Sequence, residues 1–386
     1  MKLTNFALIF IGVTLPIIII VYVNVSYTIK AEEQEMYYET VINSAIQDAT
    51  SQMKEVENND KSIDYGYSGL WNNKVSVNSQ LAVDTFFNSL YNNFDIKGNA
   101  SAESYMQLFI PAVAIVDYNG VQVSSMEQYT DTSGNIIKNH ILKPKKYYSY
   151  SYVIDGKNVS DLDGFTGNYD SVHTVEFTMD DYIVHRSSSK LLGNTTTKGF
   201  FTSDNLNNSD LISGVSGTLG DADRTALKNK VIGLLQSKRK QIISETVMNE
   251  MNYAVNRNNS FAKASGINYD FTFPDYAKED WYSSVENIGI IAFVQGLSIG
   301  NKYLDYHAYG LASLTLATKY YLTTPGPNSK IQMNLYHSDR TCPEYRASTH
   351  METPAFATSK QEAASMFSLS NGVTYRGFYP CPICKP

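Results

Sequence analysis

Residues 6–23 read FALIFIGVTLPIIIIVYV, a run of eighteen residues without a charge, interrupted by Thr14 and Pro16. A helix needs about 18 to 20 predominantly apolar residues to cross the hydrocarbon core of a bilayer, so this run is just long enough. We therefore predict one transmembrane helix over residues 6–25. Its place near the start of the chain puts nearly all of the other residues on one side of the membrane.

A cleaved secretory signal peptide is the alternative explanation of this run, because Lys2 supplies the short positive segment with which such signals begin. The residues that follow, NVSYTIKAEEQE, offer no convincing small-x-small cleavage site, and the run is longer than the usual apolar core of a signal. A retained anchor is therefore the interpretation that we favour, and cleavage stays open.

The charges beside the apolar run predict its orientation. Lys2 and the free amino group precede the run, whereas Lys30 and three glutamates between positions 32 and 35 follow it. Positive residues favour the cytoplasmic side, so residues 1–5 are predicted to be a cytoplasmic tail and the bulk of the chain to be extracellular. Because this tail is so short, we expect no output domain in the cytoplasm.

The stretch after the span, residues 26–57, contains neither Gly nor Pro. Its apolar residues recur at roughly helical intervals, which predicts an amphipathic stalk that continues the transmembrane helix outward. The positions that carry this pattern are Ile29, Met36, Val41, Ala45, Ala49 and Met53.

Residues 58–322 have the composition of a folded domain, because the chain is 43% hydrophobic and contains 29 Tyr and 17 Phe. Asn119-Gly120 and Asp155-Gly156 each lie between runs of β-branched and aromatic residues, which predicts two β-hairpins. A helical pattern around residues 81–94 precedes them. We expect a mixed α/β extracellular domain with antiparallel strands, and an α+β fold for the whole chain.

Further along, residues 191–220 are dense in Asn, Ser, Thr and Gly and are predicted to form a long surface loop. A long helical pattern begins at about Asp221, which is a suitable N-cap residue. The stretch TTPGPNSK at 323–330 is a linker by composition, so residues 331–386 are predicted to be a small separate module.

The composition and the motifs argue against two functional classes. The net charge of −7 provides no electrostatic footprint for a nucleic-acid partner. The sequence contains no Gly-x-Ser-x-Gly elbow, no His-Glu-x-x-His pair and no phosphate-binding glycine loop. We therefore expect no enzymatic activity, and a hydrolase with an unrecognised site is the weakest of our alternatives.

The C-terminal module carries all three cysteines of the chain. His337 lies five residues before Cys342, and Cys381 and Cys384 follow as a Cys-x2-Cys pair after a spacer of thirty-eight residues. Zinc favours four sulfur and nitrogen ligands in a tetrahedron, and a two-residue gap lets one turn direct both sulfurs at one ion. This pattern predicts a metal site.

Two other chemistries compete for these cysteines. A thioredoxin-like redox pair needs its first cysteine at a helix N-terminus, and we expect no such helix because only two residues follow Cys384. A disulfide fits an oxidising extracellular compartment, in which Cys342 could pair with either later cysteine. Three cysteines would then leave one unpaired, so zinc is favoured while the disulfide remains open.

The segments FATSKQEAASMF and GFYPCPICKP give residues 331–386 a family resemblance. The module resembles the small Ada-type metal-binding module, in which a capped Ser-x-x-Glu-Ala helix precedes a terminal Cys-x-x-Cys pair. The resemblance implies a structural Zn²⁺ ion that forms the fold. The insertion SLSNGVTYR before Gly377 lengthens the spacer beyond the family pattern, and His350 is an alternative ligand. The ligands that the resemblance implies are His337, Cys342, Cys381 and Cys384.

The N-terminal architecture carries a second resemblance. A short cytoplasmic tail, a long apolar helix and an outward domain resemble the pilin and pseudopilin plan, especially TadE-like components of tight-adherence pili. The resemblance implies a structural component of a bacterial surface apparatus, whose first helix packs against partner helices in the membrane. The alternative is a membrane-anchored protein that binds an extracellular ligand or a cell-wall component.

Overall fold

The computed structural model describes residues 3–55, 76–179, 182–189, 192–200, 210–215, 219–264, 285, 287–299, 304–313, 320–337, 342–351, 356–357, 360–365, 367–370 and 373–385. The chain forms two compact units. Unit 1 contains Met1–Glu55, Val77–Lys146 and Ser244–Leu314, and unit 2 contains Val56–Ser76, Tyr147–Ile243 and Thr315–Pro386. The fold is α+β, as predicted, with one long apolar N-terminal helix and antiparallel sheets.

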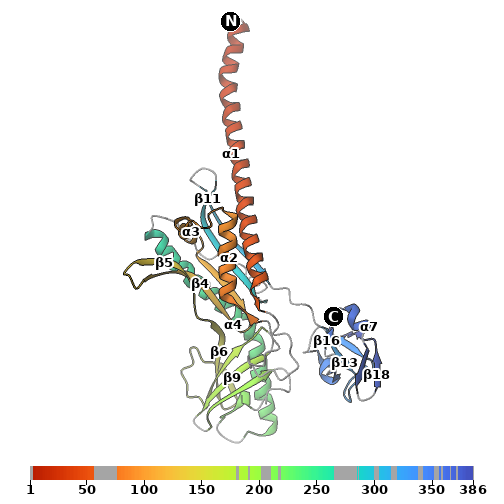
Figure 1. The fold of residues 1–386 in the computed structure, drawn as a ribbon. Coiled ribbons are helices and arrows are strands. Elements are labelled where there is room, and N and C mark those ends of the chain that lie inside the picture. Colours follow the sequence, from red (N-terminus) through yellow and green to blue (C-terminus); the bar gives the residue numbers. More distant parts are fainter. Residues whose placement is uncertain are drawn as a thin grey trace. The chain divides into compact units, whose positions relative to one another are not determined.

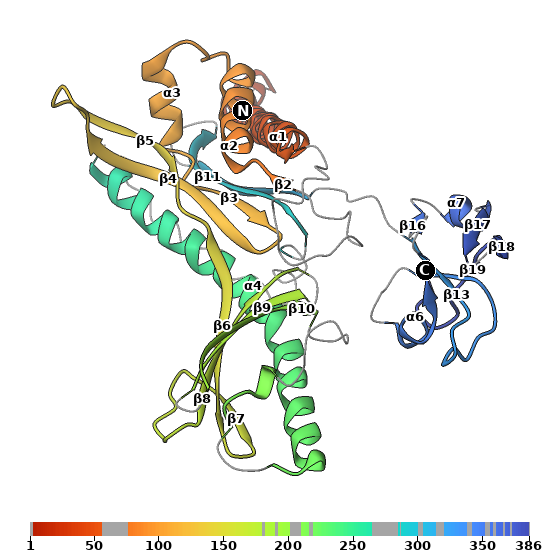
Figure 2. The same cartoon turned by 60° about the horizontal axis from the view of Figure 1, so that its bottom comes forward.

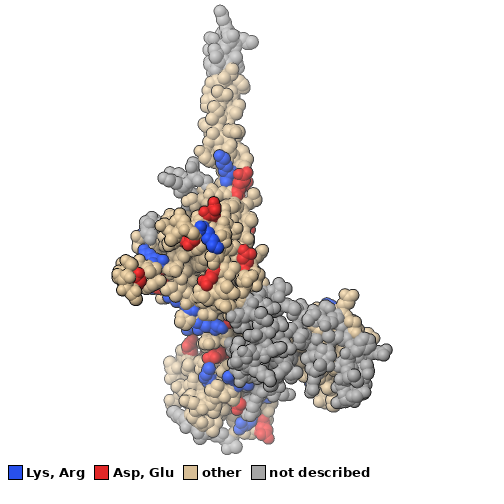
Figure 3. Space-filling view, viewed as in Figure 1, with Lys and Arg blue, Asp and Glu red and all other residues tan. Residues whose placement is uncertain are grey.

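Helix α1 (Leu3–Gln52) is one continuous helix of 50 residues. Its N-terminal half extends beyond the rest of unit 1 in Figure 1. Within the described residues, α1 is the one helix long and apolar enough to cross a membrane, with a window of mean hydropathy 2.0 that is not buried at all. On the face drawn in Figure 3, the described surface of this half shows no charged residue, and the sequence has none between Phe10 and Ile29.

The C-terminal half of α1 packs into the core of unit 1. Buried residues recur every three or four positions from Val41 to Met53 and face helix α2 (Ser79–Asn93) and two strands of the sheet. Ile29 and Met36, which are predicted to belong to this stripe, are 50% and 60% exposed instead. Among the described residues, the hydrogen bonds from α1 to the rest of unit 1 begin at Gln34, whose Nε2 donates to Ser298 O at 3.1 Å. Ile29 therefore lies before these contacts, and Met36 lies on the exposed side of the helix.

The core of unit 1 is an antiparallel sheet that has helices on both faces. Figure 2 shows α1 and α2 over one face and the part of helix α4 (Asp221–Ala264) that belongs to unit 1, from Ser244 on, along the other, while α3 (Ala100–Gln107) lies beside β5. Covering both faces explains why every residue of β3 is buried. The strands pair in the order β5 (Ile136–Leu142), β4 (Gly120–Thr130), β3 (Ala112–Asp117), β11 (Gly289–Ile299) and β12 (Leu304–Ser313), and β1 (Lys54–Glu55) pairs with β2 (Ser76–Val77).

The predicted hairpin at Asn119-Gly120 is present, with its turn placed one residue earlier. Asp117 pairs with Gly120, so Tyr118 and Asn119 form the turn. Gly120 already belongs to β4, and a Cβ atom there would lie 2.5 Å from the carbonyl oxygen of Lys146. This glycine therefore serves a close approach of two backbones rather than a left-handed turn.

Unit 2 contains a further run of antiparallel strands and the N-terminal part of α4, up to Ile243. The second predicted hairpin is present here, and Gly156 has the positive φ of 56° that its turn requires. Part of the predicted loop at 191–220 is instead strand β10, followed by the short helix η1 (Asp210–Ile212). The strands pair in the order β10 (Gly193–Phe200), β9 (Tyr182–Ser189), β8 (Ser171–Phe177), β6 (Lys146–Asp155) and β7 (Asn158–Asp161).

Two buried histidines lie on β8 and β9, in the middle of this run of strands. His173 Nδ1 and His185 Nε2 are 3.0 Å apart and share a hydrogen bond, and Ser171 Oγ lies 2.7 Å from His173 Nε2. The ring of Tyr152 stacks on His173 with a centroid distance of 4.8 Å. Burial lowers the pKa of His173 to about 3, with a further contribution from His185, and burial lowers the pKa of His185 to about 4.

These pKa values predict that acid destabilises the protein. The unfolded chain takes up protons on both histidines below their ordinary pKa of about 6.5, whereas the folded protein does not until the pH is much lower. Stability should therefore be complete above about pH 6.5 and fall by up to about 1.4 kcal/mol per pH unit for each histidine down to about pH 4. Urea unfolding at about pH 7 and about pH 5 measures this loss.

The double variant His173→Gln/His185→Gln provides the control for this pH dependence. The variant lacks the two titrating groups of the pair. Both the variant and the unmodified protein keep His140, whose pKa burial also lowers, so the contribution of His140 is the same in both. We expect the variant to be less stable at neutral pH and to lose less stability on acidification. Equal pH dependence in the two proteins would show that the buried pair does not govern acid stability.

Residues 320–385 form a small region with its own core, which contains Leu322, Tyr336, Met351 and Phe378. Strand β13 includes Thr323 and Thr324, which the sequence assigns to a linker. Both threonines are buried and pair with neighbouring strands, because β-branched side chains suit a covered strand. The elements of this C-terminal region are β13 (Tyr320–Thr324), β14 (Leu335–His337), α6 (Pro343–Ala347), β15 (Thr349–His350), β16 (Phe356–Ala357), α7 (Lys360–Ser365), β17 (Phe367–Ser370), β18 (Val373–Arg376) and β19 (Tyr379–Pro380).

Candidate metal centre

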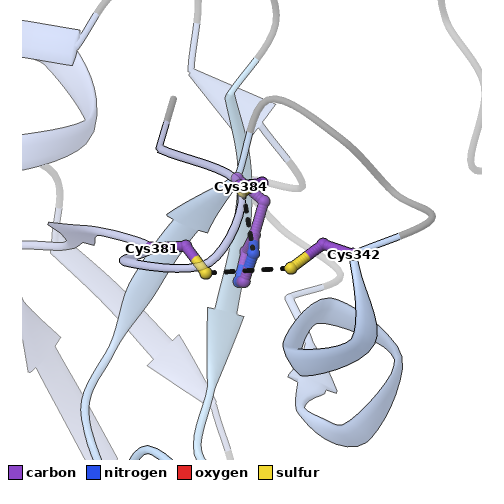
Figure 4. A group of neighbouring side chains, drawn as sticks. Cys342, Cys381 and Cys384 are labelled. Atoms are coloured by element: carbon purple, nitrogen blue, oxygen red, sulfur yellow. Dashed lines mark hydrogen bonds between the residues drawn. The ribbon is translucent and has the colours of Figure 1, made fainter.

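His337, Cys342, Cys381 and Cys384 lie together in this C-terminal region. Their ligand atoms all fall within 4.8 Å of one another, so the cluster could hold a metal ion. Figure 4 shows Cys381 and Cys384 on one turn of the backbone and Cys342 opposite them on another segment, and a dashed line joins Cys384 to the His337 imidazole. The sequence spacing thus predicts residues that the fold brings to one point.

The local backbone explains this convergence. His337 ends β14, which pairs in parallel with β19 just before Cys381, and the Cys381 amide donates to Tyr336 O at 3.1 Å. The chain then turns, and the Lys385 amide donates to Cys381 O at 2.9 Å, which returns Cys384 to the same place. Cys342 enters from the other side as the residue before α6.

Two distances between ligand atoms match the edges of a tetrahedral metal site. Cys342 Sγ and Cys381 Sγ are 3.8 Å apart, and Cys384 Sγ and His337 Nδ1 are 3.7 Å apart. With metal–sulfur bonds of about 2.3 Å and metal–nitrogen bonds of about 2.0 Å, the edges of such a tetrahedron are about 3.5 to 3.8 Å. A disulfide would instead place its two sulfurs about 2.05 Å apart, and all three cysteines are free thiols here.

The four residues use up the coordination positions of such an ion. His337 and Cys381 are completely buried, Cys342 is 3% exposed, and Cys384 is half-buried beside the exposed Ile383. A site with four protein ligands has no open position for water or substrate, which is typical of structural rather than catalytic sites.

Thr323 orients the imidazole of His337. Its Oγ1 lies 2.9 Å from His337 Nε2 and 3.5 Å from Leu335 O, to which the hydroxyl can donate. The His337 Nε2–H then donates to the threonine oxygen, and in this tautomer Nδ1 is unprotonated, as a metal ligand must be. Second partners of this kind fix the ring and tune its affinity for a metal.

We predict that Thr323→Val lowers the metal affinity about 10- to 100-fold without abolishing the fold. The valine keeps the shape and the branched Cβ of the threonine but cannot accept the hydrogen bond, so neither the ring nor its tautomer is fixed. Competition with a chromophoric chelator measures the change. Thr324→Val, which alters the neighbouring buried threonine away from the ligands, is the matched control, and equal affinities in both variants would refute the role of Thr323.

Glu344 supports the site from α6 and was not anticipated from the sequence. This carboxylate is 1% exposed and accepts hydrogen bonds from the Ser329 hydroxyl and from the Lys330 and Ile331 amides. Burial raises its pKa, but these hydrogen bonds and the nearby His337 lower it more, so the pKa falls below its ordinary value. Its position two residues after Cys342 was the one available signal.

Two features bear on the Ada-type resemblance. The described residues of the inserted segment SLSNGVTYR, 368–370 and 373–376, belong to the paired strands β17 and β18, which lie outside the ligand cluster. Helix α7 is present, whereas Ser359, its expected cap, lies outside the described residues. His350, the alternative ligand, is outside the cluster, because it hydrogen-bonds Tyr345 O at 2.9 Å and stacks on that ring.

No family model, no curated protein and no solved structure matches this chain.

Proposed function

We propose that the C-terminal cluster binds one Zn²⁺ ion in a structural role. Three thiolates and one imidazole form a soft ligand set, and a tetrahedral arrangement of sulfur and nitrogen is typical of zinc. The donor set and the distances between the ligand atoms support this proposal. The ion would link three backbone segments and thereby hold together a region with a small core.

We further propose that α1 anchors the protein in the cell membrane as a single span, with its N-terminus in the cytoplasm and the rest outside. The fully exposed apolar half of α1 supports the span, since large apolar surfaces are otherwise rarely exposed to water. The distribution of charges, with Lys2 before the span and several glutamates after it, supports the orientation.

The function that fits best is that of a structural component of a bacterial surface apparatus, similar in plan to minor pilins. The single observation that carries this proposal is the division of α1, whose second half is packed into unit 1 while its first half is left free for other helices. Because α1 is continuous, the position of its membrane segment fixes the position of the folded part of unit 1. Partner helices in the membrane would pack against the free half.

A photo-crosslinking experiment tests this assembly role. A benzophenone amino acid replaces Ile29, which is exposed on α1 just after the predicted span, and irradiation of intact cells should trap complexes with other helices. The same amino acid in place of Ile136, which is exposed on β5, is the control and should yield the monomer. Monomer alone at both positions, together with unchanged surface appendages in a deletion strain, would refute the proposal.

A further inference from the structure

A cavity of about 340 Å³ lies between α2, the end of α3 and strand β5 within unit 1. Its size is near the lower end of ligand cavities, which range from about 300 to 1,000 Å³. Nothing in the proposed function of α1 or of the metal centre uses this cavity. The residues that line the cavity indicate which ligand it could bind.

Helical spacing gives the cavity an apolar floor and a polar rim. Val83, Phe87 and Tyr91 follow one another at intervals of four residues on α2 and are buried, which places them in one row along the floor. Asp84 and Asn88 form the next row on the same helix and are exposed. Ligands of mixed character, with an apolar face and polar edges, match this division.

Several hydrogen-bonding groups of the lining have no protein partner. Within the described residues, the amide of Asn88 makes no hydrogen bond, and the amide nitrogen of Asn139 makes none. The Tyr91 oxygen accepts from Gln107 Nε2 at 2.8 Å, while its own hydroxyl proton has no acceptor among the described residues. These groups offer both donors and acceptors to a bound molecule.

The charges of the lining exclude an anionic ligand. No Lys or Arg lines the cavity, and burial lowers the pKa of His140 to about 4, which keeps its imidazole neutral at physiological pH. Asp84 is the one charged residue of the lining, and one of its oxygens accepts from Gln80 Nε2 at 2.9 Å. The site therefore suits a neutral molecule with many hydroxyl groups.

We propose that this cavity binds one or two rings of a neutral saccharide. The hydroxyl groups of a sugar both donate and accept. They can therefore pair with the side-chain amides of Asn88 and Asn139, the second oxygen of Asp84 and the hydroxyl proton of Tyr91, while the C–H face of the sugar packs against the aromatic floor. Phe87 is fixed for this contact, since its ring lies 4.8 Å from that of His140. The protein would thereby hold a surface or wall polysaccharide beside its membrane anchor.

Ligand-observed saturation-transfer NMR tests this proposal on the full chain. The protein is kept in a detergent without a sugar headgroup, and the probes are glucose, N-acetylglucosamine, cellobiose and chitobiose, with ethanolamine as a cationic probe. We expect saturation transfer to at least one of the sugars and none to ethanolamine. Absence of transfer to every sugar overturns the proposal, and so does binding of ethanolamine alone.

Two variants tie the signal to the cavity. Asn88→Ala and Asn139→Ala each remove a free hydrogen-bonding group from an exposed position and should weaken sugar binding about five- to tenfold. Asn92→Ala, an exposed residue of the same helix outside the lining, is the control and should leave binding unchanged. Sugar binding that survives both lining variants shows that the sugar binds elsewhere and refutes the assignment.

Discussion

Removal of the metal, or the change Cys381→Ser, should unfold residues 320–385 while the sheet of unit 1 stays folded. Structural zinc contributes roughly 10 to 16 kcal/mol of apparent binding free energy at neutral pH in small zinc modules, where binding and folding are one process. Among the described residues, the two core clusters around the site contain only seven and four buried residues, so we expect them to be insufficient without the ion.

Hydrogen exchange followed by mass spectrometry measures this loss. After chelation, the amides of β13 and β14 should exchange rapidly, whereas those of α2 and β11 should keep their protection. The matched control is Ile383→Ser, because Ile383 lies between the two cysteines of the pair and is 49% exposed. A metal-free protein with a Cys342 disulfide and a protected module would refute the zinc assignment.

The ligand cluster and the long helix illustrate what the sequence determines locally. A long apolar run predicts a membrane helix from its own residues alone, because such a helix needs no contact with other parts of the chain to satisfy its backbone. Helix α1 is indeed continuous through Pro16. The spacing of the cysteines likewise selects residues that one turn can present together, and Cys381 and Cys384 lie on such a turn. The role of Thr323 depends on the pairing of β13 with β14, which no local pattern reveals.

The sequence predictions that were wrong or missing have a common physical cause, because the burial of a residue depends on neighbours that are far away in the sequence. Strand β10 reads GNTTTKGF and resembles a loop, because it is a polar strand that is defined by its pairing with β9. Similarly, His173 and His185 carry no ligand-like spacing, yet two paired strands bring their rings into hydrogen-bonding contact. Polar side chains that are satisfied by one another give no hydrophobic signal in the sequence.

Replacing Ile18 and Ile19 by arginine should abolish stable membrane anchoring. Both isoleucines are exposed on the free half of α1, at 62% and 52%, and lie near the middle of the predicted span. Each arginine at the centre of a membrane helix costs about 2.5 to 3.5 kcal/mol on insertion scales, so the pair costs roughly 5 to 7 kcal/mol. A span of only eighteen uncharged residues is just long enough to cross the bilayer, so we expect this cost to exceed its net free energy of insertion.

Carbonate extraction of membranes measures the effect, since an anchored protein stays in the pellet. The control is the pair Ile136→Arg and Leu192→Arg, which makes the same chemical change at positions 66% and 57% exposed outside α1 and should leave the protein in the membrane. If the Ile18/Ile19 variant were extracted no more than the control, α1 would not be the anchor. Its exposed apolar surface would then have to be covered by protein, which would make helix partners rather than lipid its primary environment.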